Sequence, residues 1–579
     1  MTATDNQHNA RRYKNSTQRK ANGVTYTPTR LANFVSHQIT CAYKPPQNAK
    51  SICILDPALG DGELLVSLVA LLRQKYPDLK LECYAFDTDS DAICRAKERL
   101  GQFGDSVVTD FKCEDFVSYM CSEGGVKRDL FNQQEPRQFD LVIANPPYVR
   151  TQILGAVRAQ ELAKVFSLRG RVDLYYVFLL VISASLKCDG IAGIIVSNRF
   201  MTTRSGASVR SKLLEQFQIL HVWDFGDTKL FDAAVLPAVL LLANALVPSS
   251  QQPKLSSIYE SSQAPSLYSQ EPISALSHEG IVEVEDGRRF EVRHGALKTN
   301  HDTSGVWTIG TKQGDRFLAT TLDYTWGTFR DLGKVRVGVK TCADSIFIRS
   351  DWNELDAFDA PELLRPLITH HVARRFRADS GASARKILYP HESLDRKRQP
   401  VDLSQYSRTR RYLEAHRNAL EKRTYVTKAG RKWYELWVPQ NPADWECPKV
   451  VFRDISERPT FWMDLKGSIV NGDCYWLKCD TPSQEHLLWL VLCVANSSFI
   501  EKFYDYKFNN KLYSGRRRFI TQYVEQFPLP DPDRSISHKM MKMAHQIFES
   551  PRYAETEHLQ KHLNSMVWEA FGLSEEAFG

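Results

Sequence analysis

The chain has 579 residues and carries 75 Lys and Arg against 68 Asp and Glu, a net charge of +7. Its length exceeds one hydrophobic core and predicts two or more domains, and 43% hydrophobic with 25% charged residues is typical of a soluble globular protein. No apolar run reaches the roughly 18 residues of a membrane span, so a membrane protein is excluded and no membrane partner is expected.

The first 22 residues are polar and basic, and we interpret them as a flexible tail. They contain no apolar core of a signal peptide, so the protein is expected in the cytoplasm. The 12 cysteines are scattered without a C-x-x-C pair, and the two nearest to each other, Cys474 and Cys479, have a spacing that fits no common zinc site. Free thiols and no metal are therefore expected.

The first helix is predicted just after Thr27-Pro28, which fits an N-cap with proline at the first helical position. Residues 51–56 form an apolar strand, and a glycine turn, Pro57-Ala58-Leu59-Gly60-Asp61-Gly62-Glu63, leads into a helical pattern. Strand, glycine turn and helix are the first half of a nucleotide-binding unit. The third glycine of G-x-G-x-x-G is replaced by Leu65, which argues against a dinucleotide or phosphate ligand.

Two further strands end in acidic residues. Residues 81–86 run into Asp87, and a carboxylate at this place can accept both hydroxyls of a ribose. Asp89 and Asp91, which follow, are interpreted as helix-start carboxylates rather than ligands. A third strand precedes Cys113-Glu114-Asp115-Phe116, where the acid pair fits either a ligand site or an ordinary loop.

The fourth strand is the apolar run from Asp140 to Ala144, and it stops at Asn145-Pro146-Pro147-Tyr148. The two prolines lack an N–H and have a fixed φ, so they end the strand and stiffen the turn. The turn offers an amide, backbone carbonyls and an aromatic ring, which together suit a planar NH2 group. A proline-stiffened loop with a surface tyrosine is the plainer alternative.

The remainder of this half continues the alternation of strand and helix. A long apolar helix is predicted from Asp173 to near Lys187, followed by strands at residues 194–196, 219–224 and 235–242, with Phe231 in the loop between the last two. This pattern predicts an α/β fold with a doubly wound sheet. We therefore expect one catalytic domain over residues 23–246.

Beyond the catalytic domain the composition changes. Residues 247–272 are rich in Ser, Pro and Gln and are predicted to be a linker or long loop. A mixed α+β domain is expected over residues 273–530 and a helical segment over 531–579. Residues 374–432 hold 17 Lys and Arg against 6 Asp and Glu, an excess of 11 that is larger than the net charge of the whole chain.

The order of these segments resembles the gamma class of DNA adenine-N6 methyltransferases, the TaqI-like group, over about residues 20–245. Class I S-adenosylmethionine-dependent methyltransferases of this group carry a D-x-x-x-G-x-G turn before the Asn-Pro-Pro-Tyr motif and a target-recognition domain after it. The carboxyl half is also similar to recognition domains of the group in Gly338-Val339-Lys340-Thr341, Lys432-Trp433-Tyr434-Glu435-Leu436 and Phe527-Pro528-Leu529-Pro530.

The resemblance implies a role for each matching residue. S-adenosyl-L-methionine would be held by Thr27, Pro28, Asp56, Ala58, Gly60, Gly62, Asp87, Asp115 and Phe116. Asn145, Pro146, Pro147 and Tyr148 would form the catalytic turn, with Tyr148 and Phe231 against a flipped adenine. No Pro-Cys dipeptide occurs, which disfavours a cytosine C5 methyltransferase, because that reaction needs a cysteine nucleophile.

Double-stranded DNA is the expected partner of the basic carboxyl half. The cations predicted to contact it are Arg374, Arg375, Arg396, Lys397, Arg398, Arg410, Arg411, Lys432, Arg516, Arg517 and Arg518. A solvated face is the plainer interpretation of such runs. The resemblance also raises a separately encoded restriction endonuclease as a partner, which the sequence neither requires nor excludes.

Three alternatives stay open on the sequence. Protein-glutamine methyltransferases also use Asn-Pro-Pro-Tyr for a planar amide, although they lack a large basic carboxyl domain. An RNA adenine methyltransferase would need the same turn. A catalytically inactive DNA-binding protein on the same fold is the third, although Asn145, Asp56 and both turn glycines are present.

Overall fold

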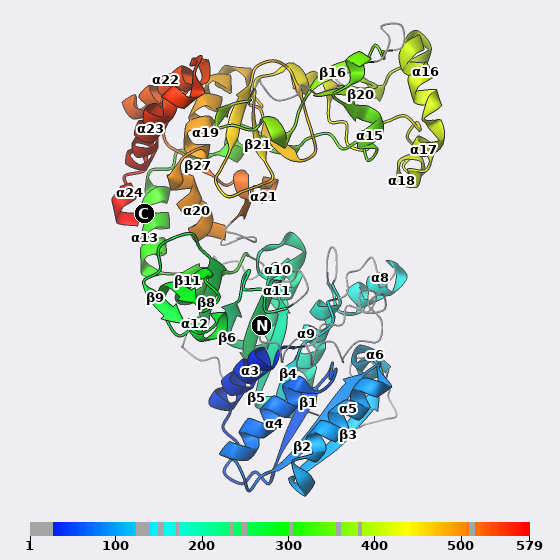
Figure 1. Ribbon diagram of the computed structural model, residues 1–579, viewed down its shortest axis with the longest axis vertical. Coiled ribbons are helices and arrows are strands. Elements are labelled where there is room, and N and C mark those ends of the chain that lie inside the picture. Colours follow the sequence, from blue (N-terminus) through cyan, green and yellow to red (C-terminus); the bar gives the residue numbers. More distant parts are fainter. Residues whose placement is uncertain are drawn as a thin grey trace. The chain divides into compact units, whose positions relative to one another are not determined.

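The structure is a computed structural model that describes residues 27–122, 138–148, 156–168, 173–231, 236–244, 252–299, 305–354, 360–379, 385–395, 397–508 and 516–578. The predicted basic tail lies outside these described residues. The chain divides into two compact units, Met1–Thr311 with Leu512–Gly515 and Lys312–Lys511 with Arg516–Gly579, which we call unit 1 and unit 2 (Figure 1).

Unit 1 is built on one large sheet with helices on both faces. Its strands are β1 (Ser51–Asp56), β2 (Lys80–Asp87), β3 (Val107–Cys113), β4 (Phe139–Ala144), β5 (Leu186–Ser197), β6 (Gln218–Asp224), β7 (Pro237–Ala243), β8 (Lys254–Glu260), β9 (Leu267–Ser269), β10 (Gly280–Val284), β11 (Arg289–Lys298) and β12 (Thr308–Gly310). Its helices are α3 (Thr29–Ala42), α4 (Glu63–Lys75), α5 (Ser90–Gly101), α6 (Phe116–Ser122), α8 (Ala156–Val165), α9 (Leu174–Ser185), α10 (Arg199–Thr202), α11 (Ala207–Gln216) and α12 (Pro272–Ala275), with short 3-10 turns at Gly104–Ser106 and Arg204–Gly206.

The strand order is β3-β2-β1-β4-β5-β7-β6-β8-β11-β10-β9, with β12 paired to β11. Strands β1 to β5 run parallel, and β7 lies antiparallel between β5 and β6. Because β6 runs in the same direction as β5, the carboxyl ends of β1, β2, β4, β5 and β6 meet at one edge of the sheet. The predicted fold class, a doubly wound α/β methyltransferase sheet, is confirmed.

Side chains of β4 show why the strands are apolar along their whole length. Leu141 and Ile143 lie in the hydrophobic core shared with α3, α4 and α5, whereas Val142 and Ala144 lie in the core shared with α6, α9 and α11. Successive strand residues point to opposite faces, and both faces are covered by helices (Figure 1). An uninterrupted apolar run is therefore required here instead of an alternating one.

Helix α3 lies directly on β5 because of one glycine. A Cβ atom at Gly193 would fall 2.6 Å from Cδ1 of Ile39 and 2.8 Å from Cγ1 of Val35. Both side chains are fully buried. Any larger residue at position 193 would lift the helix that carries Thr27 and Pro28 at its start, so this contact fixes the position of that segment over the sheet.

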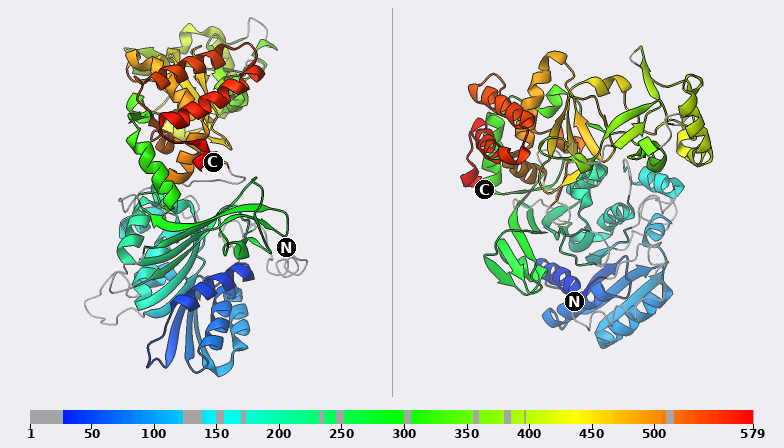
Figure 2. Two further views of the ribbon diagram at one scale, coloured as in Figure 1. Left: turned by 90° about the vertical axis from the view of Figure 1, so that its left-hand side faces the viewer. Right: turned by 45° about the horizontal axis from the view of Figure 1, so that its top comes forward.

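The predicted linker at residues 247–272 is wrong, because strand β8 lies within it. β8 pairs parallel with β6, from His221 opposite Lys254 to Asp224 opposite Ser257, and it extends the sheet toward β11 (Figure 2). Ser256 is buried, and its hydroxyl lies 2.9 Å from Nε2 of His221 and 2.8 Å from Nδ1 of His294. A serine-rich composition therefore does not exclude a buried strand, and the boundary between the two units lies at Thr311 instead.

Unit 2 is an α+β domain made of short strands and several helices. Its strands are β13 (Gly327–Thr328), β14 (Arg336–Val337), β15 (Ile348–Arg349), β16 (Leu364–Ile368), β17 (Phe376–Arg377), β18 (Arg385–Leu388), β19 (His391–Leu394), β20 (Lys397–Pro400), β21 (Lys449–Arg453), β22 (Ile455–Ser456), β23 (Phe461–Asp464), β24 (Ile469–Val470), β25 (Cys474–Leu477), β26 (Arg517–Arg518) and β27 (Pro528–Leu529). Its helices are α13 (Lys312–Asp323), α14 (Phe329–Leu332), α15 (Asp344–Phe347), α16 (Ser407–Ala415), α17 (Arg417–Glu421), α18 (Thr424–Lys428), α19 (Leu488–Ala495), α20 (Ser498–Phe508), α21 (Thr521–Val524), α22 (Ser535–Glu549), α23 (Glu557–Ala570) and α24 (Glu575–Phe578).

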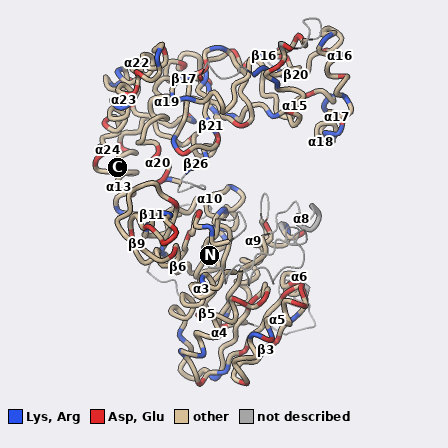
Figure 3. The backbone as a smooth tube through the Cα atoms, viewed as in Figure 1, with Lys and Arg blue, Asp and Glu red and all other residues tan. Residues whose placement is uncertain are grey.

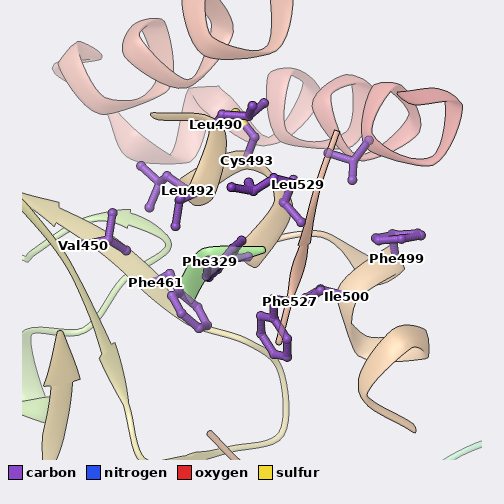
Figure 4. Packing of buried hydrophobic residues seen from close by; sticks show 14 of the residues in the cluster. Phe329, Val450, Phe461, Leu490, Leu492, Cys493, Phe499, Ile500, Phe527 and Leu529 are labelled. Carbon is purple, nitrogen blue, oxygen red and sulfur yellow. The ribbon is translucent and has the colours of Figure 1, made fainter. Parts of the chain in front are cut away.

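Two sheets organise unit 2, one with the order β14-β25-β21-β23-β17 and the other with the order β15-β18-β16-β24. The first packs against helices in a core that contains Phe461, Phe499 and Phe527 (Figure 4). Helices α22 and α23 contribute Met540 and Trp568 to that same core. The predicted separate helical segment at 531–579 is therefore part of unit 2.

Among the helices of the described residues, no single one is long and apolar enough to cross a membrane. One pair, Pro482–Ala495 with Ser498–Phe508, reaches the required length and composition only together, across a bend of 78°.

Candidate active site

The carboxyl edge of the sheet brings three predicted site residues to neighbouring strands. Asp56 ends β1, Asp87 ends β2, and Asn145 follows β4 directly. β1 lies between the other two, paired with Ala85 opposite Asp56 on one side and with Val142 opposite Leu55 on the other. Residues more than 80 positions apart in the sequence therefore share one edge, as the parallel topology requires.

Asp56 is a buried carboxyl group with one unmatched oxygen. Its Oδ1 accepts a hydrogen bond of 3.1 Å from the backbone N–H of Ala58, while Oδ2 has no hydrogen-bond partner among the described residues. Burial raises the pKa of Asp56 to about 8, and the carboxylate of Asp87 acts in the same direction. A cation beside Oδ2 would favour the ionised form, so this position fits the ammonium group of a bound ligand.

The glycine turn is held in place by hydrogen bonds from both sides. The N–H of Gly60 donates to Oδ2 of Asp87 at 2.7 Å, and the N–H of Leu59 donates to the carbonyl of Phe86 at 2.9 Å. Gly62 has a φ of +80°, and a Cβ atom there would lie 2.8 Å from Cβ of Ala96 on α5. Glycine at position 62 is therefore required both by the left-handed backbone of the turn and by the close contact between α4 and α5.

Asp87 has two structural bonds in addition to its predicted ligand role. Besides Gly60, it accepts a hydrogen bond of 2.9 Å from the N–H of Asp89. Asp89 in turn caps α5 by accepting from the N–H groups of Asp91 and Ala92, which confirms its interpretation as a helix-start residue. The carboxylate of Asp87 is partly exposed, so it remains suited to accept hydrogen bonds from a ribose.

Asp115 and Phe116 lie at the start of α6 and differ in their surroundings. The Oδ1 atom of Asp115 accepts from the N–H of Ser118 at 2.7 Å and from its hydroxyl at 2.6 Å, at the start of α6. The ring of Phe116 is 2% exposed and packs on Phe86 and Phe178, with ring centroids 5.1 and 6.1 Å away. The ring thus belongs to the core, and the contact with a cofactor that the resemblance implies stays a prediction.

The Asn-Pro-Pro-Tyr turn is joined to the segment before α3. Nδ2 of Asn145 donates a hydrogen bond of 3.0 Å to Oγ1 of Thr27, and the Tyr148 hydroxyl donates one of 3.0 Å to Oδ1 of Asn145. Burial raises the pKa of Tyr148 well above its usual range, so the hydroxyl keeps its proton and acts as the donor. The amide of Asn145 is therefore fixed at both ends.

Thr27 does not cap α3, which corrects the expected helix start. The N-cap residue is Pro28, whose carbonyl accepts from the N–H groups of Leu31 and Ala32 at 3.0 Å each. The Thr27 side chain is buried, 6% exposed, and its hydroxyl is directed to Asn145 instead. A threonine before proline thus contacts the Asn-Pro-Pro-Tyr turn, which sequence spacing alone did not indicate.

Phe231 lies in the core on the α3 side of the sheet. It is 6% exposed and belongs to the cluster that contains Trp223 and Phe225. Residues 232–235 lie outside the described part of the chain. Tyr148 packs against the core on the other side of the sheet, and the role of Phe231 against a base stays a prediction.

A buried polar cluster at the same edge was not predicted. Asp224 accepts from Nδ2 of Asn198 at 2.9 Å and from the Tyr259 hydroxyl at 2.6 Å, and its Oδ1 also accepts from the N–H of Gly226 at 3.1 Å. Burial raises the pKa of Asp224 despite these hydrogen bonds. The cluster braces the loop that leads to Phe231, and its signal was the polar residues at the ends of β5 and β6.

The predicted DNA-binding cations do not form one surface. Figure 3 shows Lys and Arg of unit 2 spread over several elements with Asp and Glu between them. Arg374 pairs with Asp379 at 2.5 Å and Arg410 with Glu414 at 2.9 Å. Lys397, Arg398, Arg411, Lys432 and Arg516 are exposed, Arg375 is partly buried, and Arg396 lies outside the described residues.

Arg517 has a structural role in place of the predicted DNA contact. Its side chain is 12% exposed and forms two hydrogen bonds of 2.8 Å with the carboxylate of Asp505, which is 6% exposed. Its NH1 also donates to the carbonyl of Glu457 at 2.7 Å. Arg518 pairs with Asp454 at 3.1 Å. The two adjacent arginines therefore join α20 and the β21–β22 region to β26.

Two family models match the sequence. The Eco57I restriction-modification methylase matches residues 84–231, and the TaqI-like C-terminal specificity domain matches residues 400–529. The first match runs from the end of β2 to Phe231 and includes the Asn-Pro-Pro-Tyr turn. The described residues of the second match all belong to unit 2.

Similar proteins cover nearly the whole chain. The Type II methyltransferase M.BanIII of Aneurinibacillus aneurinilyticus is 36% identical over 572 residues, which are 96% of this chain and 97% of the relative. The Type II methyltransferase M.PaeR7I of Pseudomonas aeruginosa is 24% identical over 88% of this chain and 86% of that relative. A similar fold occurs in a nuclease-deletion mutant of the Type ISP restriction-modification enzyme LlaGI in complex with a DNA substrate mimic, with a TM-score of 0.52 and 10% identity over 91% of this chain and 47% of that one.

Proposed function

This chain belongs to the Type II DNA methyltransferases of restriction-modification systems, and we propose that it methylates the N6 amino group of adenine in duplex DNA with S-adenosyl-L-methionine as methyl donor. The observation that carries the proposal is the amide of Asn145, held between Thr27 and Tyr148 at the carboxyl end of β4. An amide fixed in this way presents an oriented acceptor to a planar amine. Adenine offers such an amine on an aromatic ring.

The chemical problem is that the amine is a poor nucleophile, because its lone pair is delocalised into the ring. Asn145 Oδ1 and the Pro146 carbonyl are the acceptors for its two hydrogens, and they draw the nitrogen toward tetrahedral geometry. An amide oxygen has two lone pairs, so the Tyr148 hydroxyl and the amine can both donate to Oδ1. These oriented dipoles also stabilise the positive charge that develops on the nitrogen.

The orientation of the Asn145 amide depends on Thr27. With Nδ2 donating to the Thr27 hydroxyl and Oδ1 accepting from Tyr148, the oxygen lies on the side of the Tyr148 ring. A reversed amide would direct a donor at the substrate amine and repel it. Thr27 is therefore proposed as a positioning residue for the catalytic amide, in addition to the cofactor role that the resemblance implies.

The cofactor site is proposed at the ends of β1, β2 and β3. The unmatched Oδ2 of Asp56 suits the ammonium group, Asp87 suits the ribose hydroxyls, and Asp115 suits the adenosine amine. Ala58, Gly60 and Gly62 form the turn over which the chain would pass closest to the ligand. When bound, S-adenosyl-L-methionine supplies an electrophilic methyl group on its sulfonium.

A target inside a duplex must leave the base stack to reach this turn. Unstacking costs a few kcal/mol, and stacking of the extruded base on Tyr148 would offset about 1–3 kcal/mol of it. Tyr148 is backed by Tyr175, with ring centroids 6.0 Å apart at 70°. This edge contact supports one side of the Tyr148 ring and leaves base stacking to the other.

The test is transfer of a labelled methyl group to DNA, RNA and protein acceptors in parallel, followed by identification of the methylated nucleoside. We expect label in duplex DNA as N6-methyladenine. Label recovered as N4-methylcytosine, in RNA or on glutamine would each overturn the proposal. The proposed partner of this modification is a separately encoded restriction endonuclease, which cleaves the same site when it is unmethylated.

A further inference from the structure

Unit 2 contains an open hollow beside β14. The cavity has a volume of about 530 Å3 and is lined by Lys334, Arg336, Lys340, Gln440, Tyr475 and Thr521, with Val335 and Val337 between them. Among the described residues that line it, none is acidic. Three cations within seven positions of the sequence thus line a single concave surface.

The segment that carries these cations is fixed against the sheet by glycines. A Cβ atom at Gly333 would lie 2.0 Å from the carbonyl oxygen of Lys478, and one at Gly338 would lie 2.0 Å from that of Asn471. β14 between them pairs antiparallel with β25, with Arg336 opposite Trp476. Glycine at both positions lets the backbone lie close against its neighbours, and the pairing with β25 holds β14 in place, so the hollow is preformed.

Two of the side chains that line the hollow are also held in position. The guanidinium of Arg336 lies over the ring of Trp476, 5.3 Å from its centroid. Nε2 of Gln440 donates to the carbonyl of Val337 at 2.6 Å, which fixes its amide at the rim. A stacked guanidinium keeps its charge and its outward N–H groups available to an anion.

The charges of these three residues are not neutralised within the described part of the chain. No ion pair of the described residues involves Lys334, Arg336 or Lys340, whereas Arg374, Arg410, Arg517 and Arg518 all have carboxylate partners. Lys334 and Lys340 are exposed. Unpaired cations around a preformed concavity attract an anion strongly, whereas cations already paired with carboxylates attract it weakly.

We infer that this hollow is a contact site for consecutive backbone phosphates of the DNA substrate. The inference rests on the proposed function and deepens it, because it assigns the phosphate contact of unit 2 to a different set of residues from the basic run at 374–432. A cavity this open, with separated cations and with amide and hydroxyl groups between them, suits an extended polyanion better than one small anion. Phosphate contacts of this kind set the register of a protein on a duplex without reading bases.

The experiment measures affinity for a short random-sequence DNA duplex across a potassium chloride series. The hollow variant is Lys334→Ala/Lys340→Ala. The matched control is Arg552→Ala/Lys561→Ala, which removes the same charge from exposed helical ion pairs with Glu555 and Glu557. We expect the salt slope of the hollow variant to fall by about 1.8, at about 0.9 per lost phosphate contact, and the slope of the control to stay at the wild-type value.

A slope that is equal in the hollow variant, the control and the wild type overturns the inference. Lys334→Gln/Lys340→Gln keeps much of each side-chain stem, and a thermal unfolding transition like that of the wild type verifies that each variant is folded. The proposed function is decided separately, by whether the wild-type protein produces N6-methyladenine in DNA. A reduced slope supports the phosphate site even if the methylated base proves to be a different one.

Discussion

The carboxyl edge of unit 1 and the basic run of unit 2 show two different relations between sequence and surface. Asp56, Asp87 and Asn145 are far apart in the chain, yet parallel strands bring them to one edge. Residues 374–432 are contiguous, yet they fold into separate short strands and helices, and several of their cations pair with carboxylates. Topology gathers residues at a site more reliably than proximity in the sequence does.

Arg517→Ala tests whether a cation of the basic clusters belongs to the fold. It leaves the buried carboxylate of Asp505 without its partner, and we expect the free energy of unfolding to fall by about 3–5 kcal/mol. Denaturant titration measures this. Arg516→Ala, at an exposed neighbour, is the control and should change stability by less than about 0.5 kcal/mol. Equal, small effects at both positions would contradict the structural role.

Asn145→Ala tests whether the edge of unit 1 holds the chemistry. Loss of one oriented acceptor is expected to lower the methyl-transfer rate about 100- to 1,000-fold. Affinity for S-adenosyl-L-methionine, measured by calorimetry, should change little, because Asn145 is assigned to the substrate amine and not to the cofactor. A rate close to that of the wild type would remove Asn145 from the catalytic role.

The pH dependence of cofactor binding tests Asp56. Its pKa in the free protein is raised to about 8, and only the ionised carboxylate pairs with an ammonium group. As the pH falls below 8, the dissociation constant for S-adenosyl-L-methionine should therefore rise by up to about tenfold for each pH unit. Because the pKa of Asp56 is higher in the folded protein than its ordinary value, its contribution to the free energy of unfolding is present below about pH 4. This contribution is lost as the pH rises through about 8.

Asp56→Asn is the control for that profile. It cannot ionise, so binding should be weak and nearly independent of pH between 6 and about 8. The change of the dissociation constant with pH is best measured below pH 8, because the α-amino group of the cofactor itself titrates near pH 8. A wild-type affinity that does not vary over this range would place the ammonium elsewhere.

Thr27→Val tests the smallest effect, the orientation of the Asn145 amide. Valine removes the acceptor for Nδ2 at nearly constant volume, and we expect the turnover rate to fall by about tenfold, or about 1.4 kcal/mol. Thr27→Ser should restore most of the rate, because it keeps the hydroxyl. Unchanged turnover in the valine variant with weaker cofactor binding would leave Thr27 only its cofactor role.

Much of unit 1 was predictable, because buried parallel strands give uninterrupted apolar runs and end at residues with special chemistry. That logic found Asp56, Asp87 and the Asn145 turn, and it fits the strand order of the sheet. The same reasoning could not find Tyr259. Its strand, β8, also contains the buried Ser256, whose hydrogen-bond partners lie on β6 and β11. Nor could this reasoning show that the Phe116 ring lies in the core, because apolar character does not reveal whether a ring faces the core or a ligand.

Unit 2 was predictable only as a domain. Its strands are two to five residues long, too short for a periodic pattern, and their partners are distant, as β14 with β25. Whether a cation is paired depends on these long-range contacts, so Arg517 and Lys334 cannot be distinguished by composition. The similarity to a specificity domain over residues 400–529 identifies the domain without identifying its charged surface.

The pairing of β8 with β6 has a consequence for dividing this protein into parts. A chain ended near residue 246 would lose β8 and leave β6 with a row of unpaired backbone N–H and C=O groups along His221 to Asp224. Such an open edge pairs readily with the same edge of another copy. A soluble, independently folding catalytic fragment therefore requires the chain as far as Thr311, where β12 has completed the sheet.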